Sequence, residues 1–89
     1  MKRKFEYYAV FKTAPEGGYC ITFPDLPGAI SEGDDYDDAL YMARDCMITW
    51  LDDGVDAPRA SSKEELERRV ASDPDIVGDW RLVLIEAEI

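Results

Sequence analysis

Carboxylates are the most abundant chemically active side chains in this sequence, which has 20 Asp and Glu among its 89 residues and no His. His is the usual general base near neutral pH, and the Ser-His-Asp and Cys-His arrangements of hydrolases both require it. His is also the commonest ligand of transition metals. Catalysis or metal binding would therefore have to rest on carboxylates.

Two acidic clusters have oxygen atoms at spacings that suggest a cation site. The first, residues 34–38, lacks the spacing of a calcium loop. It stands where a helix is predicted to begin, so capping and the helix dipole explain its carboxylates. In the second, residues 73–79, Leu84 occupies the place at which a calcium loop needs a bidentate Glu. The sequence predicts no metal ion and no cofactor.

The sequence contains two cysteines, Cys20 and Cys46, which are too few for a disulfide framework or a four-thiolate zinc site. Each suits a small buried position, and a reducing compartment is their natural setting. The first six residues run into an alternating pattern without the apolar core of a signal peptide, and no stretch approaches a membrane span. We expect a cytoplasmic protein.

The acidity of the chain is concentrated in one third of its length. The net charge of −10 repels nucleic-acid phosphates and anionic membranes and attracts basic proteins. Residues 25–53 contain nine acids and one base, which gives this stretch a charge of −8. The charge could serve solubility alone, but its local concentration favours a surface that binds a cationic protein.

The secondary-structure elements that would position these acidic residues begin with a predicted β-hairpin. Apolar and polar residues alternate over 4–13 and again over 19–23, with turn residues Ala14-Pro15-Glu16-Gly17-Gly18 between them. Pro24 and Pro27 cannot continue a strand, so the chain bends there before a short third strand at 29–31.

A helical pattern follows, with Asp34 or Asp35 as its N-cap, beginning at residue 35 or 36 and running to about 53, where Gly54 ends it. One face of this helix is apolar and the opposite face is acidic. Tyr41 and Ile48 lie on its flank and either support the next segment or contact a partner. A second, short helix over 62–71 and a final strand over 80–89 complete the pattern.

The order β-β-β-α-(α)-β predicts one α+β domain over residues 1–89. We expect a four-stranded mixed sheet of order 3-2-1-4, in which the last strand runs parallel to the first and the long helix packs on one face. On the other face we expect an apolar surface for homo-oligomer formation, unless the second helix and residues 55–79 cover it. Its residues are Tyr8, Val10, Val83 and Ile85.

A series of short motifs follows in order along the first half of the chain. They are Gly17-Gly18-Tyr19, Phe23-Pro24-Asp25-Leu26-Pro27-Gly28, Gly33-Asp34, and Asp38-Ala39-Leu40 with Ala43. This series resembles the hallmark of the HicB family of antitoxins. The resemblance implies a partial RNase H-like fold and a role in binding a small basic HicA toxin, an mRNA-cleaving ribonuclease, so as to mask its RNA surface.

The RNase H-like fold implied by this resemblance does not bring nuclease activity with it, because fold and function separate. The strand acids Glu6, Glu86 and Glu88 have no converging fourth group, so we expect a protein that is not an enzyme. Ala29 stands where the family commonly has Cys. Many family members also have a C-terminal DNA-binding domain, and this chain ends at Ile89, so direct DNA binding is not expected of it.

The predicted partner-binding residues lie around the proline bend and the following helix start. A rigid bend would present an apolar knob beside carboxylates, although the two prolines could also serve only to end a strand. The leading functional hypothesis is inhibition of the toxin by occlusion. The alternative is a stand-alone ligand-binding or homo-oligomeric domain. The predicted contact residues are Asp25, Leu26, Pro27, Gly28, Glu32, Asp34 and Asp35.

Overall fold

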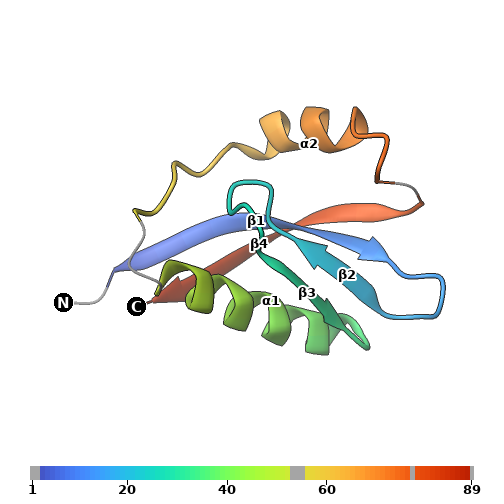
Figure 1. Cartoon of the computed structure of the whole chain (residues 1–89), viewed down its shortest axis with the longest axis horizontal. Helices are drawn as coiled ribbons and strands as arrows, with labels where there is room; N and C mark the ends of the chain where they lie inside the picture. Colours follow the sequence, from blue (N-terminus) through green and yellow to red (C-terminus); the bar gives the residue numbers. More distant parts are fainter. Residues whose placement is uncertain (1–2, 53–55, 77, 89) are drawn as a thin grey trace.

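The computed structural model describes residues 3–52, 56–76 and 78–88, in which four strands form one sheet between two helices (Figure 1). The sheet order is β3-β2-β1-β4, as predicted. The long helix α1 lies on one face of the sheet and the short helix α2 on the other (Figure 1). The elements are β1 (Lys4–Thr13), β2 (Tyr19–Thr22), β3 (Ile30–Gly33), α1 (Tyr36–Leu51), α2 (Lys63–Ala71) and β4 (Trp80–Glu88).

Strand β4 runs antiparallel to β1, so the prediction of a mixed sheet is wrong. All three strand pairs are antiparallel. The prediction allowed for one crossover, and α1 alone would have returned the chain to the end at which β1 begins. Residues 56–71 instead pass once more along the opposite face, so β4 starts beside the end of β1 (Figure 1). There the Thr13 backbone N–H donates to the Asp79 carbonyl at 2.9 Å.

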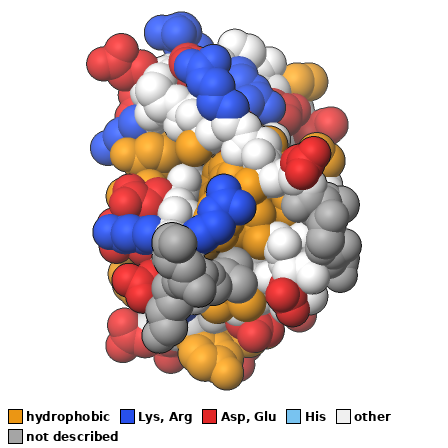
Figure 2. Space-filling view, turned by 90° about the vertical axis from the view of Figure 1, so that its left-hand side faces the viewer, with side chains coloured by type: hydrophobic (Ala, Val, Ile, Leu, Met, Phe, Trp, Pro, Cys, Tyr) orange, Lys and Arg blue, Asp and Glu red, His pale blue; other side chains and the backbone are white. Residues whose placement is uncertain are grey.

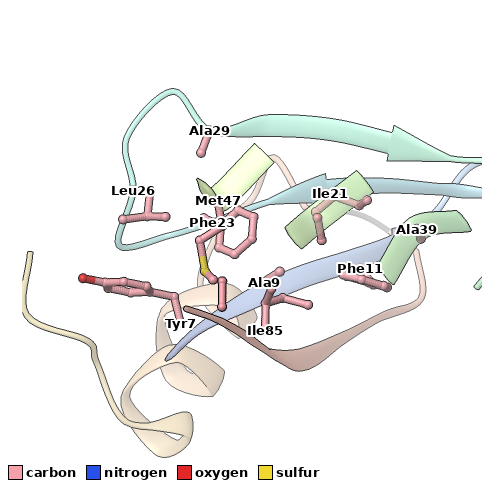
Figure 3. Packing of buried hydrophobic residues seen from close by; sticks show 12 residues of the cluster. Tyr7, Ala9, Phe11, Ile21, Phe23, Leu26, Ala29, Ala39, Met47 and Ile85 are labelled. Atoms are coloured by element: carbon pink, nitrogen blue, oxygen red, sulfur yellow. The ribbon is translucent and has the colours of Figure 1, made fainter. Parts of the chain in front are cut away.

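The main core lies between the sheet and α1 (Figure 3). The helix contributes mainly small residues, and a Cβ on Gly33 would lie 2.5 Å from the Cα of Ala39, so β3 and α1 approach with almost no gap. This contact fixes the start of α1 against an edge strand. The fully buried members are Ala9, Phe11, Ile21, Leu26, Ala39, Ala43 and Met47.

The four residues predicted to form one oligomer surface do not share a face. In the observed register, Ile85 pairs with Tyr7 and Val83 with Ala9, so Val83 and Ile85 belong to the α1 face. The error arose because residues 82–85 are apolar throughout and give no period from which to assign faces. Tyr8 and Val10 lie on the α2 face. On that face, Leu66 and Val70 of α2 are buried and Val10 is only 2% exposed. For Val10, the alternative prediction that the second helix covers this face is therefore correct.

The predicted ends of two elements fall partly outside the described residues. Helix α1 ends at Leu51 with Asp52 as its C-cap, and the predicted stop at Gly54 lies in the undescribed range 53–55. Strand β4 is described to Glu88, and its predicted last residue, Ile89, is not. Neither described helix is long and apolar enough to cross a membrane.

Candidate protein-interaction surface

The proline bend is a tight loop whose apolar residue points inward. Ala29 N–H donates to the Leu26 carbonyl at 3.0 Å, and Leu26 N–H donates to the Phe23 carbonyl at 3.1 Å. The Leu26 side chain is fully buried in the cluster that contains Phe23 (Figure 3). The prediction of an exposed apolar knob is therefore wrong for Leu26, whereas Pro27 and Gly28 beside it are exposed.

Asp25 also turns inward and binds the chain that leads into α2. Its carboxylate accepts hydrogen bonds from the backbone N–H and the Oγ of Ser61, both at 2.7 Å, and lies 3.5 Å from the Arg69 guanidinium. The Asp25 side chain is 7% exposed. This carboxylate is used within the protein, so it cannot serve as a free contact for a partner.

The two helices hold the bend from opposite sides. Trp50, near the end of α1, donates from Nε1 to the Pro27 carbonyl at 3.0 Å. Arg69 of α2 donates to the Pro24 carbonyl at 3.4 Å. Neither contact was predicted from the sequence. The partners are 23 positions apart in the first contact and 45 in the second, and such separations leave no local sequence pattern. These contacts hold Pro27 and Gly28 in fixed positions on the surface.

Glu32, Asp34 and Asp35 form an exposed row at the end of β3 and the start of α1, here called the acidic edge. Asp35 is the N-cap of α1, as the sequence allowed, and its Oδ1 accepts from the Asp38 N–H at 2.8 Å. Asp38 in turn accepts from the Asp34 N–H at 2.9 Å. Within the described part of the chain, the carboxylates of Glu32 and Asp34 have no ion-pair or hydrogen-bond partner.

A groove of about 340 Å³ runs beside the acidic edge, between β3 and α1. Ile30 borders the groove and is 71% exposed, with its side chain on the face of β3 opposite α1, and Asp45 adds a further carboxylate to the groove wall. We call this feature the β3–α1 groove. The residues that line it are Gly28, Ala29, Ile30, Ser31, Met42, Asp45, Cys46, Thr49 and Trp50.

The groove lacks a reactive nucleophile. The Cys46 thiol donates to the Ile30 carbonyl with the sulfur 3.8 Å from the oxygen. Burial raises the pKa of this thiol, and the charge of Asp45 raises it further. A raised pKa keeps the sulfur protonated at neutral pH, and the thiol is a poor nucleophile and metal ligand in that form.

The outer face of α1 extends the same surface. Tyr41 is 69% exposed, whereas Ile48 is partly buried against the core, so of these two flanking residues only Tyr41 is available on the surface. Figure 2 views the end of the molecule at which β1 begins and β4 ends. Basic side chains gather over α2 at the top, and the lower part shows mainly acidic and hydrophobic side chains.

The strand acids considered for nuclease chemistry are partly neutralised by a lysine. Glu6 on β1 lies directly opposite Glu86 on β4 in the strand register. The Lys4 ammonium lies 3.3 Å from a Glu6 carboxylate oxygen and 3.8 Å from a Glu86 carboxylate oxygen. A hydrogen bond to Glu6, and then the charge of Glu86, raise the pKa of Lys4. Among the described residues, no three His, Cys, Asp or Glu side chains are grouped to hold a metal ion.

The contact set predicted from the sequence did not include Ile30 or Asp45. Ile30 was assigned to the third strand, and its exposure follows from its place on the β3 face that α1 does not cover. The alternation from Ile30 to Glu32 was the available signal, but two positions are too few to assign a face. Asp45 was correctly predicted on the acidic side of the helix. That it lines a groove could not be predicted, because the position of β3 relative to the helix was not known from the sequence.

Comparison with known proteins gives matches to one family. Residues 7–89 match the model of the HicB-like antitoxin of bacterial toxin–antitoxin systems. Antitoxin HicB 2 of Photorhabdus laumondii is 33% identical over an aligned stretch of 69 residues, and the match covers 73% of this chain and 49% of that protein. Antitoxin HicB of Escherichia coli K12 is 37% identical over 46 residues, which are 52% of this chain and 33% of that protein. The matched part is thus about a third to a half of these relatives.

Solved structures share the fold. The HicB antitoxin of Burkholderia pseudomallei has a TM-score of 0.63 and 29% identity, covering 89% of this chain and 61% of that one. A chain of a toxin–antitoxin complex from Streptococcus pneumoniae has a TM-score of 0.70 and 17% identity, covering 94% of this chain and 69% of that one. The relatives in the sequence comparison are named antitoxins, not enzymes, which agrees with the expectation of a non-enzymatic protein. The chain belongs to the HicB-like antitoxin family of bacterial toxin–antitoxin systems.

Proposed function

We propose that this chain neutralises a small basic HicA-like toxin by binding it and covering its RNA-contacting surface. Family membership supports an antitoxin role, and the net charge of −10 supports a cationic partner. A toxin that binds RNA must present cations to phosphates, so an acidic protein competes for the same surface. Inhibition by occlusion requires no catalytic group on the antitoxin.

We place the toxin contact at the acidic edge and the β3–α1 groove. The observation that carries this assignment is the exposed Ile30 beside the carboxylates of Glu32 and Asp34, which no neighbouring cation neutralises in the described structure. An apolar anchor surrounded by charges is the usual composition of an interface centre and its rim. Pro27 and Gly28 adjoin this surface.

We leave two of the predicted residues out of the proposed contact set. Leu26 is a core residue and Asp25 binds Ser61, so substitutions of either would act on the toxin complex only by disturbing the bend. The remaining five residues form the revised set with Ile30 and Asp45. Its carboxylates would speed association with a basic toxin and make the rate sensitive to salt.

Coexpression tests the proposal. The gene for this chain is expressed with and without the neighbouring open reading frame that encodes a small basic protein. The proposal predicts that the neighbour alone stops growth, that coexpression restores growth, and that the two proteins copurify. A neighbour that is harmless alone, or a toxic neighbour that neither copurifies nor is neutralised, would contradict the proposal.

A further inference from the structure

Strand β4 is a long edge strand with one side open. It has nine residues and, in the described structure, pairs with β1 alone. The other edge strand, β3, has four residues and lies against α1. An unpaired strand edge presents a row of N–H and C=O groups that can pair with another chain, and this capacity grows with the length of the strand.

The middle of β4 lacks the features that normally prevent such pairing. Residues 82–85 have the sequence Leu-Val-Leu-Ile, with no charged residue, Pro or Gly. Leu84 is 40% exposed, and its cross-strand neighbour Tyr8 is half-buried. The charged side chains of β4 lie on either side of this stretch, at Arg81, Glu86 and Glu88.

We propose that β4 pairs antiparallel with β4 of a second copy of this chain, with the two-fold axis at Leu84. The two sheets would then form one continuous sheet, with the α1 helices on the same face. This inference does not depend on the identity of the toxin. It also replaces the face-to-face surface expected from the sequence, which the observed register rules out.

The centre of β4, residues 83–85, is self-complementary in this register, whereas Leu82 lies opposite Glu86 at its margin. Val83 lies opposite Ile85 of the second copy, Leu84 opposite itself, and Arg81 opposite Ala87. Cross-strand pairs of apolar residues stabilise a sheet, and like charges directly opposite each other destabilise it. Moving the axis to Glu86 would place two carboxylates opposite each other, so the pattern disfavours that register.

The strand order separates this interface from the acidic edge. Because the order is β3-β2-β1-β4, the acidic edge and β4 lie at opposite sides of the sheet. Pairing through β4 therefore keeps the two acidic edges far apart and leaves both of them open. The net charge of −10 on each copy still opposes association, so the dimer should strengthen as salt screens the repulsion.

Sedimentation velocity on the purified chain, over a range of protein and salt concentrations, tests the dimer. We expect the mass to double from 10.1 kDa as either concentration rises. Leu84→Lys puts two ammonium groups at the axis and should leave a monomer. The matched control is Ile30→Lys, which changes an exposed apolar residue on the other edge strand and should still form a dimer. Circular dichroism shows whether each variant is folded.

Disulfide trapping supplies a second readout if Leu84→Lys does not fold. In a Cys20→Ser background, Leu84→Cys should give a covalent dimer on mild oxidation, because residue 84 meets itself at the axis. Ile30→Cys in the same background should give far less. A wild-type chain that stays monomeric under all conditions would overturn the proposal. So would trapping through residue 30 and not through residue 84.

Discussion

The Asp25 carboxylate accepts two hydrogen bonds from Ser61, at 2.7 Å from the backbone nitrogen and 2.7 Å from Oγ. The two residues are 36 positions apart, and their contact ties the proline bend to the segment that leads into α2. The motif that carries the family resemblance therefore has a structural role at this position. Within the same motif, Pro27 and Gly28 are the residues exposed at the surface.

Replacing Asp25 should destabilise the fold. Asp25→Ala leaves the Ser61 N–H and hydroxyl without their acceptor in a half-buried site, which costs about 1–3 kcal/mol. The free energy of unfolding, measured by urea denaturation, should fall by this amount. Glu16→Ala at the exposed hairpin turn is the control and should change it little. Equal stability of the Asp25 variant and wild type would show that the contact contributes nothing.

Leu26 and Pro27 should differ sharply in their effects on stability, although they are neighbours. Leu26→Ala removes a fully buried side chain from the core, and such substitutions cost about 2–5 kcal/mol. Pro27→Ala alters an exposed residue and should cost less than about 1 kcal/mol. Thermal unfolding of both variants measures the difference. A mild Leu26→Ala and a severe Pro27→Ala would contradict the inward orientation of Leu26.

Gly33 should tolerate no side chain. A Cβ at this position would meet the backbone N and Cα of Ala39 at 2.5 Å, so Gly33→Ala must push α1 away from β3. Overpacking of this kind costs about 1–3 kcal/mol or more. Ser31→Ala, on the same strand and the same face, is the control. Denaturant midpoints compare the two variants, and a Gly33→Ala protein as stable as the control would contradict the close contact.

The Tyr7 hydroxyl should make stability fall at alkaline pH. Burial raises the pKa of Tyr7 above 10.0, and the charge of Asp25 adds to this. Because the folded pKa is the higher one, the contribution is present below the unfolded pKa and is lost as pH rises through the folded pKa. Tyr7→Phe should lower stability at neutral pH by about 1 kcal/mol, through loss of the hydrogen bond to the Pro58 carbonyl, and flatten the alkaline decline. An unchanged decline would contradict this assignment.

Local patterns in the sequence predicted much of the fold. The alternation of β1, the turn before β2 and the acidic start of α1 gave the element order, the neighbouring of β1 and β2 and the N-cap region, because each depends on residues close in the chain. The place of β4 beside β1 was expected from the helical crossover instead. Two properties of β4 could not be predicted: whether it runs parallel or antiparallel to β1, and which of its residues lie on which face of the sheet. The direction depends on the path of residues 56–71 across the sheet, and residues 82–85 are apolar on both faces.

The site was less predictable for the same reason. Pro24 and Pro27 predict a bend, but no period tells whether Leu26 between them points in or out. The partners of Asp25 lie in a segment that only the tertiary fold brings near. The exposure of Glu32, Asp34 and Asp35 could be expected because acidic side chains are mostly at the surface, a tendency that does not hold for Asp25, whose side chain is 7% exposed.

The most direct test of the toxin contact is the affinity of the purified toxin for two variants with equal charge. Glu32→Lys with Asp34→Lys changes the acidic edge, whereas Glu16→Lys with Glu67→Lys changes exposed acids elsewhere, and both take the net charge from −10 to −6. Asp35 is kept because it caps α1.

Titration calorimetry at several salt concentrations measures both complexes against wild type. We predict that the acidic-edge variant binds about tenfold or more weakly, with a shallower salt dependence than wild type, while the control variant stays within a few-fold of wild type. Equal loss of affinity in the two variants, or no loss in either, would contradict the assignment of the toxin contact to the acidic edge.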